Sequence, residues 1–224
     1  MSKLYAQGKC VIVSGSSGYV GQSLIKHLIS ETEFVILGID IAAESIKHER
    51  FIFFNGSVLD HNFLNKVSKW VKNSSLELVG IVTCIAKPEV NNSAQEYSDE
   101  LKEKFPEISE RTLELLAAWS EYPHSESTAV FEINCLGANN VVSSQLENLL
   151  ASKSASVIHV SSQYGIKTPR QQLFENRENF SYKPFPYSIS KSALLMLSEY
   201  QASIFAGTPV RVNAISPGAI LQNQ

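Results

Sequence analysis

The chain has 224 residues, of which 44% are hydrophobic and 18% are charged, and its formal net charge is -3. This length suits one domain, and the composition is that of a soluble globular protein rather than a disordered or collagen-like chain. The charge removes most of the electrostatic basis for binding nucleic acid or an anionic membrane, and no apolar run reaches the roughly 18 residues of a membrane span.

The amino-terminal residues 1–9 lack the apolar segment and cleavage site of a secretory signal, so we expect a cytoplasmic protein. Cys10, Cys84 and Cys135 are too widely spaced for a disulfide framework or for paired zinc ligands. We expect three reduced thiols in or near the core. The five histidines show no ligand spacing either, so we predict no metal site.

Short apolar runs, many of them β-branched, predict six strands, and segments with helical spacing separate several of them. This alternation predicts an α/β fold, a doubly wound parallel sheet covered by helices. The runs are continuously apolar, as expected of strands that are buried on both faces. The predicted strands are Cys10 to Ser14, Phe34 to Asp40, Phe51 to Asn55, Leu78 to Ala86, Ser156 to Ser161 and Val210 to Ile215.

Two segments interrupt this pattern within a single predicted domain of residues 1–224. Residues 87–127 are polar and acidic, and they predict a helical insertion with one helix from about Glu107 to Ser120. Residues 165–186 contain three prolines and predict a long loop. Because loops of this length in compact domains are commonly functional, we expect it to bind substrate.

A glycine-rich turn, residues 15–21, lies between the first predicted strand and an amphipathic helix. Gly15 permits the tight turn, Gly18 lets the backbone approach a pyrophosphate, and Gly21 lets the helix pack closely on the strand. The free N–H groups at the start of that helix favour a bound phosphate. The turn therefore predicts a dinucleotide site, with a turn that serves packing alone as the alternative.

Asp40 closes the second predicted strand about 20 residues beyond the glycines, where a carboxylate can accept hydrogen bonds from the adenosine ribose. Ser16 and Ser17 in the turn and Ile41 after the carboxylate provide no cation for a 2′-phosphate. This pattern favours NAD over NADP.

Tyr187 and Lys191 lie four residues apart in a predicted helix that runs to about Ala206, so the phenol and the ammonium share one face. A neighbouring positive charge stabilises phenolate and makes tyrosine usable as a general acid or base. Tyr5 and Lys9 have the same spacing but precede the first strand, so we regard that pair as accidental. Tyr187 follows a strand and a loop on the carboxyl side, where open α/β sheets bind ligands.

The order of these motifs resembles that of the short-chain dehydrogenase/reductase family over nearly the whole chain. The resemblance rests on the glycine turn, Asn134 in Glu132-Ile133-Asn134-Cys135-Leu136-Gly137, the pair Ser161-Ser162, Tyr187 with Lys191, and the segment Arg211-Val212-Asn213-Ala214-Ile215-Ser216-Pro217-Gly218. It implies a Rossmann fold, an NAD-dependent oxidoreductase and a homodimer or homotetramer built through the helices that carry Asn134 and Tyr187.

The resemblance also implies residue roles. Tyr187 exchanges a proton with the substrate oxygen, and Lys191 favours the ionised phenol and binds the nicotinamide ribose. Ser162 holds the substrate carbonyl or hydroxyl, and Asn134 supports a proton relay; a strand-end cap and a buried helix polar group are the alternatives for these two. The expected cofactor-binding residues are Gly15, Ser17, Gly18, Tyr19, Val20, Gly21, Asp40, Ile41, Ser57, Val58, Ala86, Tyr187, Lys191, Pro217, Gly218 and Ile220.

The chain departs from the family pattern in several places. The glycine spacing resembles the extended subgroup, although the length resembles the short single-domain subgroup. Residues 84–87, Cys-Ile-Ala-Lys, replace Asn-Asn-Ala-Gly, and Ser57 replaces the aspartate that contacts adenine. Family members continue through a further helix and a last strand, so we expect a sheet that lacks this strand.

These features predict an NAD-dependent oxidoreductase that interconverts a secondary alcohol and a ketone. A resemblance to short-chain dehydrogenases of bacterial surface-glycan and flagellin-sugar pathways implies a sugar or sugar derivative as substrate. Two alternatives stay open: a nucleotide-sugar epimerase or dehydratase that retains NAD, and a non-catalytic NAD-binding module.

Overall fold

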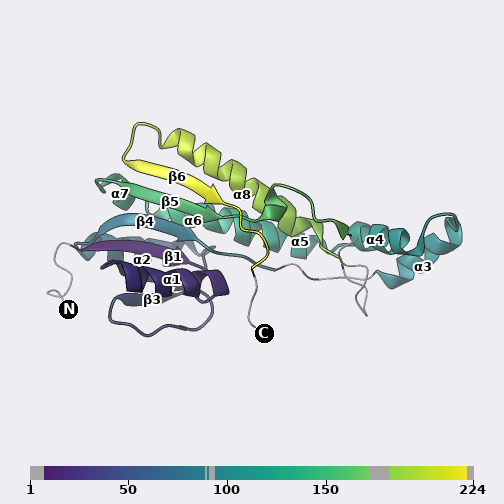
Figure 1. Cartoon of the computed structure of the whole chain (residues 1–224), viewed down its shortest axis with the longest axis horizontal. Helices are drawn as coiled ribbons and strands as arrows, with labels where there is room; N and C mark the ends of the chain where they lie inside the picture. The colour runs from purple at the N-terminus through teal and green to yellow at the C-terminus, as the bar shows by residue number, and fades with distance from the viewer. Residues whose placement is uncertain (1–7, 89, 91–93, 172–181, 221–224) are drawn as a thin grey trace.

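The computed structural model describes residues 8–88, 90, 94–171 and 182–220. Within these ranges a parallel sheet has the strand order β3-β2-β1-β4-β5-β6, which confirms the predicted doubly wound α/β fold (Figure 1). Five strands agree with the predicted ranges to within one residue at each end. The strands are β1 Lys9–Ser14, β2 Val35–Asp40, β3 Phe51–Asn55, β4 Glu77–Thr83, β5 Ala155–Val160 and β6 Val210–Ile215.

The prediction for β4 was wrong at its carboxyl end, because the strand stops at Thr83 rather than at Ala86. Pairing with β5 ends at Thr83, whose partner is His159. Cys84 then donates its N–H to the Ser14 carbonyl at 2.8 Å as the chain crosses the end of β1. Cys84 and Ile85 remain partly buried there. An apolar run reports burial, and burial continues here after strand pairing has ended.

Helices cover both faces of the sheet. Alternate residues of β1 enter two different apolar clusters, Cys10 and Ile12 in one and Val11 and Val13 in the other, so the clusters lie on opposite faces. The second cluster includes Ile25 of α1 (Tyr19–Glu31). The first includes residues of α2 (His61–Asn73), α6 (Gly137–Ser144) and α7 (Leu146–Leu150), and Phe205, which directly follows α8 (Phe185–Ile204).

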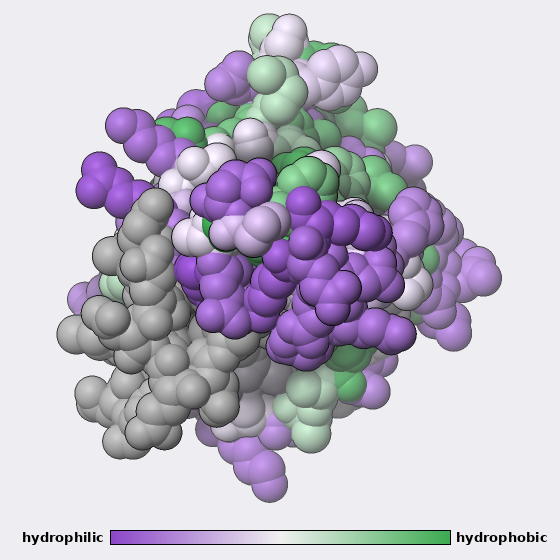
Figure 2. Space-filling view, turned by 90° about the vertical axis from the view of Figure 1, so that its right-hand side faces the viewer, coloured by the Kyte–Doolittle hydropathy of each residue, from purple (hydrophilic) through white to green (hydrophobic). Residues whose placement is uncertain are grey.

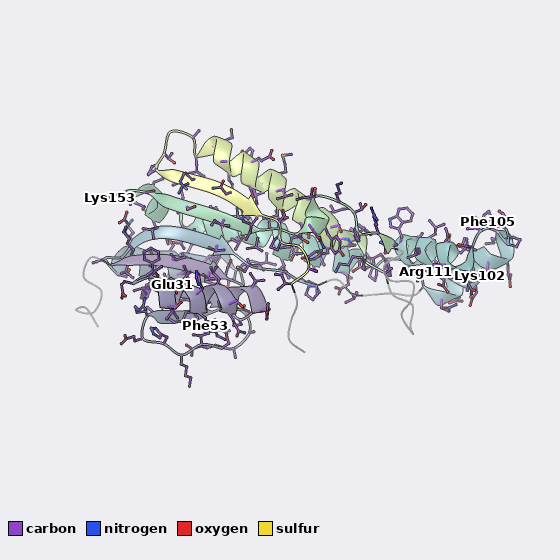
Figure 3. The ribbon with its side chains drawn as sticks, in the orientation of Figure 1. Glu31, Phe53, Lys102, Phe105, Arg111 and Lys153 are labelled. Carbon is purple, nitrogen blue, oxygen red and sulfur yellow. The ribbon has the colours of Figure 1, made fainter. Side chains whose placement is uncertain are left out.

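Residues 94–131 form α3 (Gln95–Lys104), α4 (Glu110–Ser120) and α5 (His124–Phe131). Helices α3 and α4 extend away from the sheet (Figure 1), and the view onto this end is mostly hydrophilic (Figure 2). Helix α4 begins at Glu110, later than predicted, because the Ser109 hydroxyl caps it by accepting the Thr112 N–H. Lys102 on α3 (Figure 3) joins the two helices through ion pairs with Glu110 and Glu114 of α4.

The predicted loop of residues 165–186 is shorter at its end, since α8 begins at Phe185. Pro184 and Pro186 explain the early start, because proline fits the first turn of a helix. Residues 172–181 lie outside the described part of the chain. On either side of them, the Lys183 N–H donates to Gln171 Oε1 and Gln171 Nε2 donates to the Lys183 carbonyl, each at 3.0 Å.

The three cysteines are free thiols, as predicted. Burial raises the pKa of Cys10 and of Cys84 to about 12, so both thiols are neutral near pH 7. Among the described residues, no group of His, Cys, Asp and Glu side chains is arranged to hold a metal ion. None of the helices in the described ranges has both the length and the apolar character for crossing a bilayer.

Candidate active site

The glycine turn requires glycine at two of its three positions. Gly15 has φ +74°, and a Cβ there would lie 2.7 Å from the carbonyl carbon of Cys84. A Cβ on Gly21 would lie 2.1 Å from the Gly15 oxygen. Gly18 is the extended N-cap residue of α1 and provides no side-chain cap. The N-cap position therefore offers no side-chain acceptor to the first turn of α1, which suits a bound pyrophosphate.

The carboxylate of Asp40 faces this turn from the end of β2. Its Oδ2 accepts the Ser17 N–H and its Oδ1 accepts the Ala42 N–H, each at 2.9 Å. Each carboxylate oxygen can accept a further hydrogen bond. The next side chains, Ile41, Ala42 and Ala43, are uncharged. The turn and the carboxylate together fit the phosphates and ribose of a dinucleotide.

Other predicted cofactor residues have mixed surroundings. Tyr19, Ile41, Ala86, Gly218 and Ile220 are exposed, and Val20 is half-buried. The Ser57 hydroxyl accepts the Leu59 N–H at 3.1 Å and thus completes a local turn. The Val58 side chain is buried against Gly137, where a Cβ would lie 2.6 Å from it. Sequence reasoning missed this packing role of Val58.

Pro217 and its neighbours lie beside the loop that follows β5. The Pro217 carbonyl accepts the Gln163 N–H at 2.9 Å, and the Ile215 carbonyl accepts the Ser161 N–H at 2.8 Å. The structure thus brings the Pro-Gly segment next to the serine pair, as expected if both border one site.

Lys191 is the one predicted catalytic residue with a cationic side chain, and only 2% of the residue is exposed. Its Nζ donates to the Val160 carbonyl at 2.9 Å and to the Ile85 carbonyl at 3.1 Å, which joins the end of β5 to the segment after β4. Burial lowers the pKa of Lys191 to about 8. An ammonium has three N–H donors, so these two bonds leave one for a ligand.

Tyr187 lies in the first turn of α8, and two ammonium groups approach its ring. The Lys191 Nζ lies 5.9 Å from the ring centroid, and the Lys183 Nζ lies 4.8 Å from it. The Tyr187–Lys191 pair is the one predicted from helical spacing. Lys183 was missed, because it precedes the helix and its distance in sequence from Tyr187 carries no geometric meaning there.

Asn134 is fully buried in a π-helical segment, η1 (Glu132–Leu136), that continues α5. Such segments are frequent at functional sites. The Asn134 Oδ1 accepts the Lys87 N–H at 2.6 Å, and its Nδ2 donates to Ser190 Oγ at 3.0 Å. Ser190 Oγ in turn donates to the Tyr187 carbonyl at 2.8 Å. Asn134 thus connects the segment after β4 to the first turn of α8.

Lys87, which stands where the family has glycine, takes part in this connection through its backbone. Its Nζ lies 3.0 Å from Glu126 Oε2 on α5. The side chain therefore points to the inserted helices and stabilises their attachment to the site.

Ser162 follows β5 and is almost fully buried. Its Oγ accepts the Tyr164 N–H at 3.2 Å and so caps the short 3₁₀ turn η2 (Gln163–Gly165), as the capping alternative predicts. Its own O–H hydrogen is not used in this bond. Ser161 Oγ donates to the Lys191 carbonyl at 2.8 Å, so the serine pair packs against α8 beside Lys191.

The glycine turn, Asp40 and the serine pair all follow the carboxyl ends of parallel strands, which is where open α/β sheets bind ligands. A tyrosine, a buried lysine and a serine pair meet at this edge of the sheet, to which the glycine turn also belongs. This arrangement defines a Rossmann-type oxidoreductase of the nicotinamide-dependent class. Residues 9–223 match the family model for short chain dehydrogenases. The chain belongs to the short-chain dehydrogenase/reductase family of NAD(P)-dependent oxidoreductases.

The individual relatives share low sequence identity with this chain. The post-translational flagellin modification protein A of Campylobacter coli is 24% identical over 226 residues, which cover 97% of this chain and 79% of the relative. A short chain dehydrogenase from Leptospira borgpetersenii with bound NAD+ superposes with a TM-score of 0.76 at 18% identity, over 98% of this chain and 74% of that one. A short chain dehydrogenase from Burkholderia cenocepacia in complex with NADP has a TM-score of 0.70 at 16% identity, over 97% of this chain and 75% of that one.

Proposed function

We propose that this protein interconverts a secondary alcohol and a ketone, with NAD as its redox cofactor. The observation that carries the proposal is the pair formed by Tyr187 and the buried Lys191, whose Nζ lies 5.9 Å from the tyrosine ring centroid. Family membership provides the nicotinamide chemistry, and this pair provides the proton chemistry that alcohol oxidation needs.

Each residue has a separate task in the proposed reaction. The ionised Tyr187 oxygen accepts the alcohol proton in oxidation, and the neutral phenol returns it in reduction; a bound nicotinamide would supply the hydride chemistry. The Lys191 ammonium places a positive charge 5.9 Å from the centre of the Tyr187 ring. The free O–H of Ser162 holds the substrate oxygen, and Asn134 fixes the first turn of α8 through Ser190. The protein therefore contributes alignment and electrostatic stabilisation.

The substrate class that we propose is a sugar or sugar derivative. The similarity to the flagellin modification protein of Campylobacter coli supports this class. The test is a panel of sugars, polyols and simple secondary alcohols, each incubated with NAD while the absorbance of reduced cofactor is followed. NADH formation from a secondary alcohol supports the function. Conversion of a nucleotide sugar without net NADH would instead support the retaining epimerase or dehydratase.

We propose NAD rather than NADP because Asp40 places a carboxylate beside the glycine turn with no cation among the three residues that follow it. Asp40→Asn keeps the shape and one acceptor oxygen but removes the charge. We expect the ratio of kcat/KM for NAD to that for NADP to fall by about 10²-fold, since a like-charge contact costs several kcal/mol.

The measurement is initial rates with both cofactors at saturating alcohol. The matched control is Asp99→Asn, which removes a carboxylate on the distant helix α3. An unchanged cofactor ratio in Asp40→Asn would contradict the assignment of this residue to the ribose site.

We also propose a homo-oligomer that assembles through α8. Ile189, Met196, Tyr200 and Ile204 are all more than half exposed on this helix. Their spacings of seven, eleven and fifteen residues place them within one side of the helix. An exposed apolar stripe of this kind is typical of an interface.

Met196→Lys is therefore expected to shift the protein towards the monomer, because it places a charge at the centre of the stripe. Light scattering after size-exclusion chromatography measures the mass. Trp119→Lys is the matched control, since Trp119 is similarly exposed on α4 but lies outside the stripe. A monomeric wild-type protein would rule out the oligomer.

A further inference from the structure

A buried chain of hydrogen bonds underlies the candidate site without contacting its reactive groups. Thr83 Oγ1 and His159 Nδ1 are 2.8 Å apart, His159 Nε2 and Gln201 Oε1 are 2.8 Å apart, and Gln201 Nε2 donates to Asn139 Oδ1 at 3.2 Å. Thr83, His159 and Gln201 are each at most 3% exposed. The chain joins β4, β5, α8 and α6.

The hydrogen-bond pattern determines the state of the histidine ring. Gln201 donates through Nε2 to Asn139, so its carbonyl oxygen faces His159 and accepts the Nε2–H. The neutral ring then accepts the Thr83 hydroxyl at Nδ1. Burial lowers the pKa of His159, which favours this neutral ring. Every bond in the chain then has one donor and one acceptor.

This chain of hydrogen bonds lies close to the groups that hold Lys191. Thr83 and His159 form the last residue pair between β4 and β5. Pairing between the two strands ends here, and beyond it the Lys191 Nζ bridges the two segments through the carbonyls of Ile85 and Val160. The distance between these two carbonyls, and hence the place of the Nζ, depends on how the preceding pair is held.

The same chain of hydrogen bonds also contacts α8, which carries Tyr187, and α6, which follows the segment of Asn134. Gln201 lies ten residues after Lys191 on α8, which is about 15 Å along the helix axis. Its bond to His159 is directional, whereas the apolar packing of α8 on the sheet is not. Asn139 lies in α6, directly after the π-helical segment of Asn134. One network thus sets the axial position of α8 relative to both β5 and α6.

We infer that Thr83, His159 and Gln201 form a positioning network that places the Lys191 ammonium, and with it Tyr187, for proton transfer. The three are positioning residues, because none of them contacts the reacting groups. This inference rests on the proposed function for its catalytic consequence, but the placement of Lys191 can be measured without turnover.

Thr83→Val tests the network, since it replaces the hydroxyl by a methyl group of the same shape and leaves His159 Nδ1 without its donor. Thr83→Ser restores the hydroxyl. Thr208→Val is the matched control, because the Thr208 hydroxyl is likewise hydrogen-bonded, to Phe205 and Val210, but lies before β6 at the amino-terminal edge of the sheet.

Two readouts are compared in all four proteins: kcat and KM with NAD and alcohol, and the rate at which Lys191 is dimethylated by formaldehyde and cyanoborohydride, followed by peptide mass spectrometry. In Thr83→Val we expect kcat to fall by roughly 10- to 100-fold with KM for NAD within about threefold, because a small misplacement of reacting groups is costly. Lys191 labelling should rise at least about fivefold through local opening. In Thr83→Ser and Thr208→Val, both the kinetic constants and the Lys191 labelling rate should stay near the wild-type values.

A Thr83→Val protein that labels Lys191 at the wild-type rate would overturn the inference, whatever its activity. Equal increases of the Lys191 labelling rate in Thr83→Val and Thr208→Val would also overturn the inference, since they would indicate general destabilisation of the protein. If the wild-type protein oxidises no alcohol, the proposed function fails, and the labelling comparison alone decides whether the network positions Lys191.

Discussion

Tyr187→Phe is expected to lower kcat for alcohol oxidation by about 10²- to 10⁴-fold, the usual contribution of a positioned general acid or base. The change removes one oxygen and keeps the ring, so its packing near Lys183 and Lys191 is retained. Cofactor binding should therefore stay within about threefold of wild type. Steady-state rates and NADH fluorescence titration measure the two quantities separately.

Tyr200→Phe is the matched control, because Tyr200 lies on the same helix and is exposed. We expect it to leave kcat unchanged. A Tyr187→Phe protein that keeps more than about a tenth of the wild-type kcat would show that another group moves the proton, and the proposed mechanism would fail.

Lys191→Met is expected to abolish most of the turnover and to change how stability depends on pH. In the folded protein burial lowers the pKa of Lys191 from 10.5 to about 8. Below about pH 8 both the folded and the unfolded chain carry the proton, and the cost of burying the charge is fully present. Between the two pKa values the unfolded chain binds more protons than the folded chain, so this group makes stability rise with pH.

The free energy of unfolding of the wild type should therefore increase relative to Lys191→Met by about 2–3 kcal/mol from about pH 7 to about pH 10, at roughly 1.4 kcal/mol for each pH step inside the window. Urea denaturation of both proteins across this range measures the difference, in which the other titrating groups cancel. Lys66→Met, on the exposed side of α2, should show no such trend. If the difference in free energy of unfolding between wild type and Lys191→Met did not change with pH, Lys191 would be charged in both the folded and the unfolded protein over the whole range.

Local patterns were sufficient for the fold and for the glycine turn. Alternation of apolar strands with amphipathic helices predicts a doubly wound sheet, because burial on both faces imposes continuous apolar runs on each strand. The glycines of the turn could also be predicted from the sequence. A Cβ at Gly15 or Gly21 would clash with atoms that are close in the chain or that lie at the end of a predicted strand. The pairing of Tyr187 with Lys191 follows from helical spacing alone.

The features that the sequence did not disclose depend on contacts between residues that are distant in the chain. The end of β4 is set by where β5 stops pairing with it, and Lys183 approaches Tyr187 from outside the helix. Thr83 and His159 are 76 residues apart, and His159 and Gln201 are 42 apart. A threonine, a histidine and a glutamine have no shared periodicity, so no pattern in the chain marks them as partners. Their pairing arises because the sheet and α8 bring them into one buried space, where each polar group must find a partner.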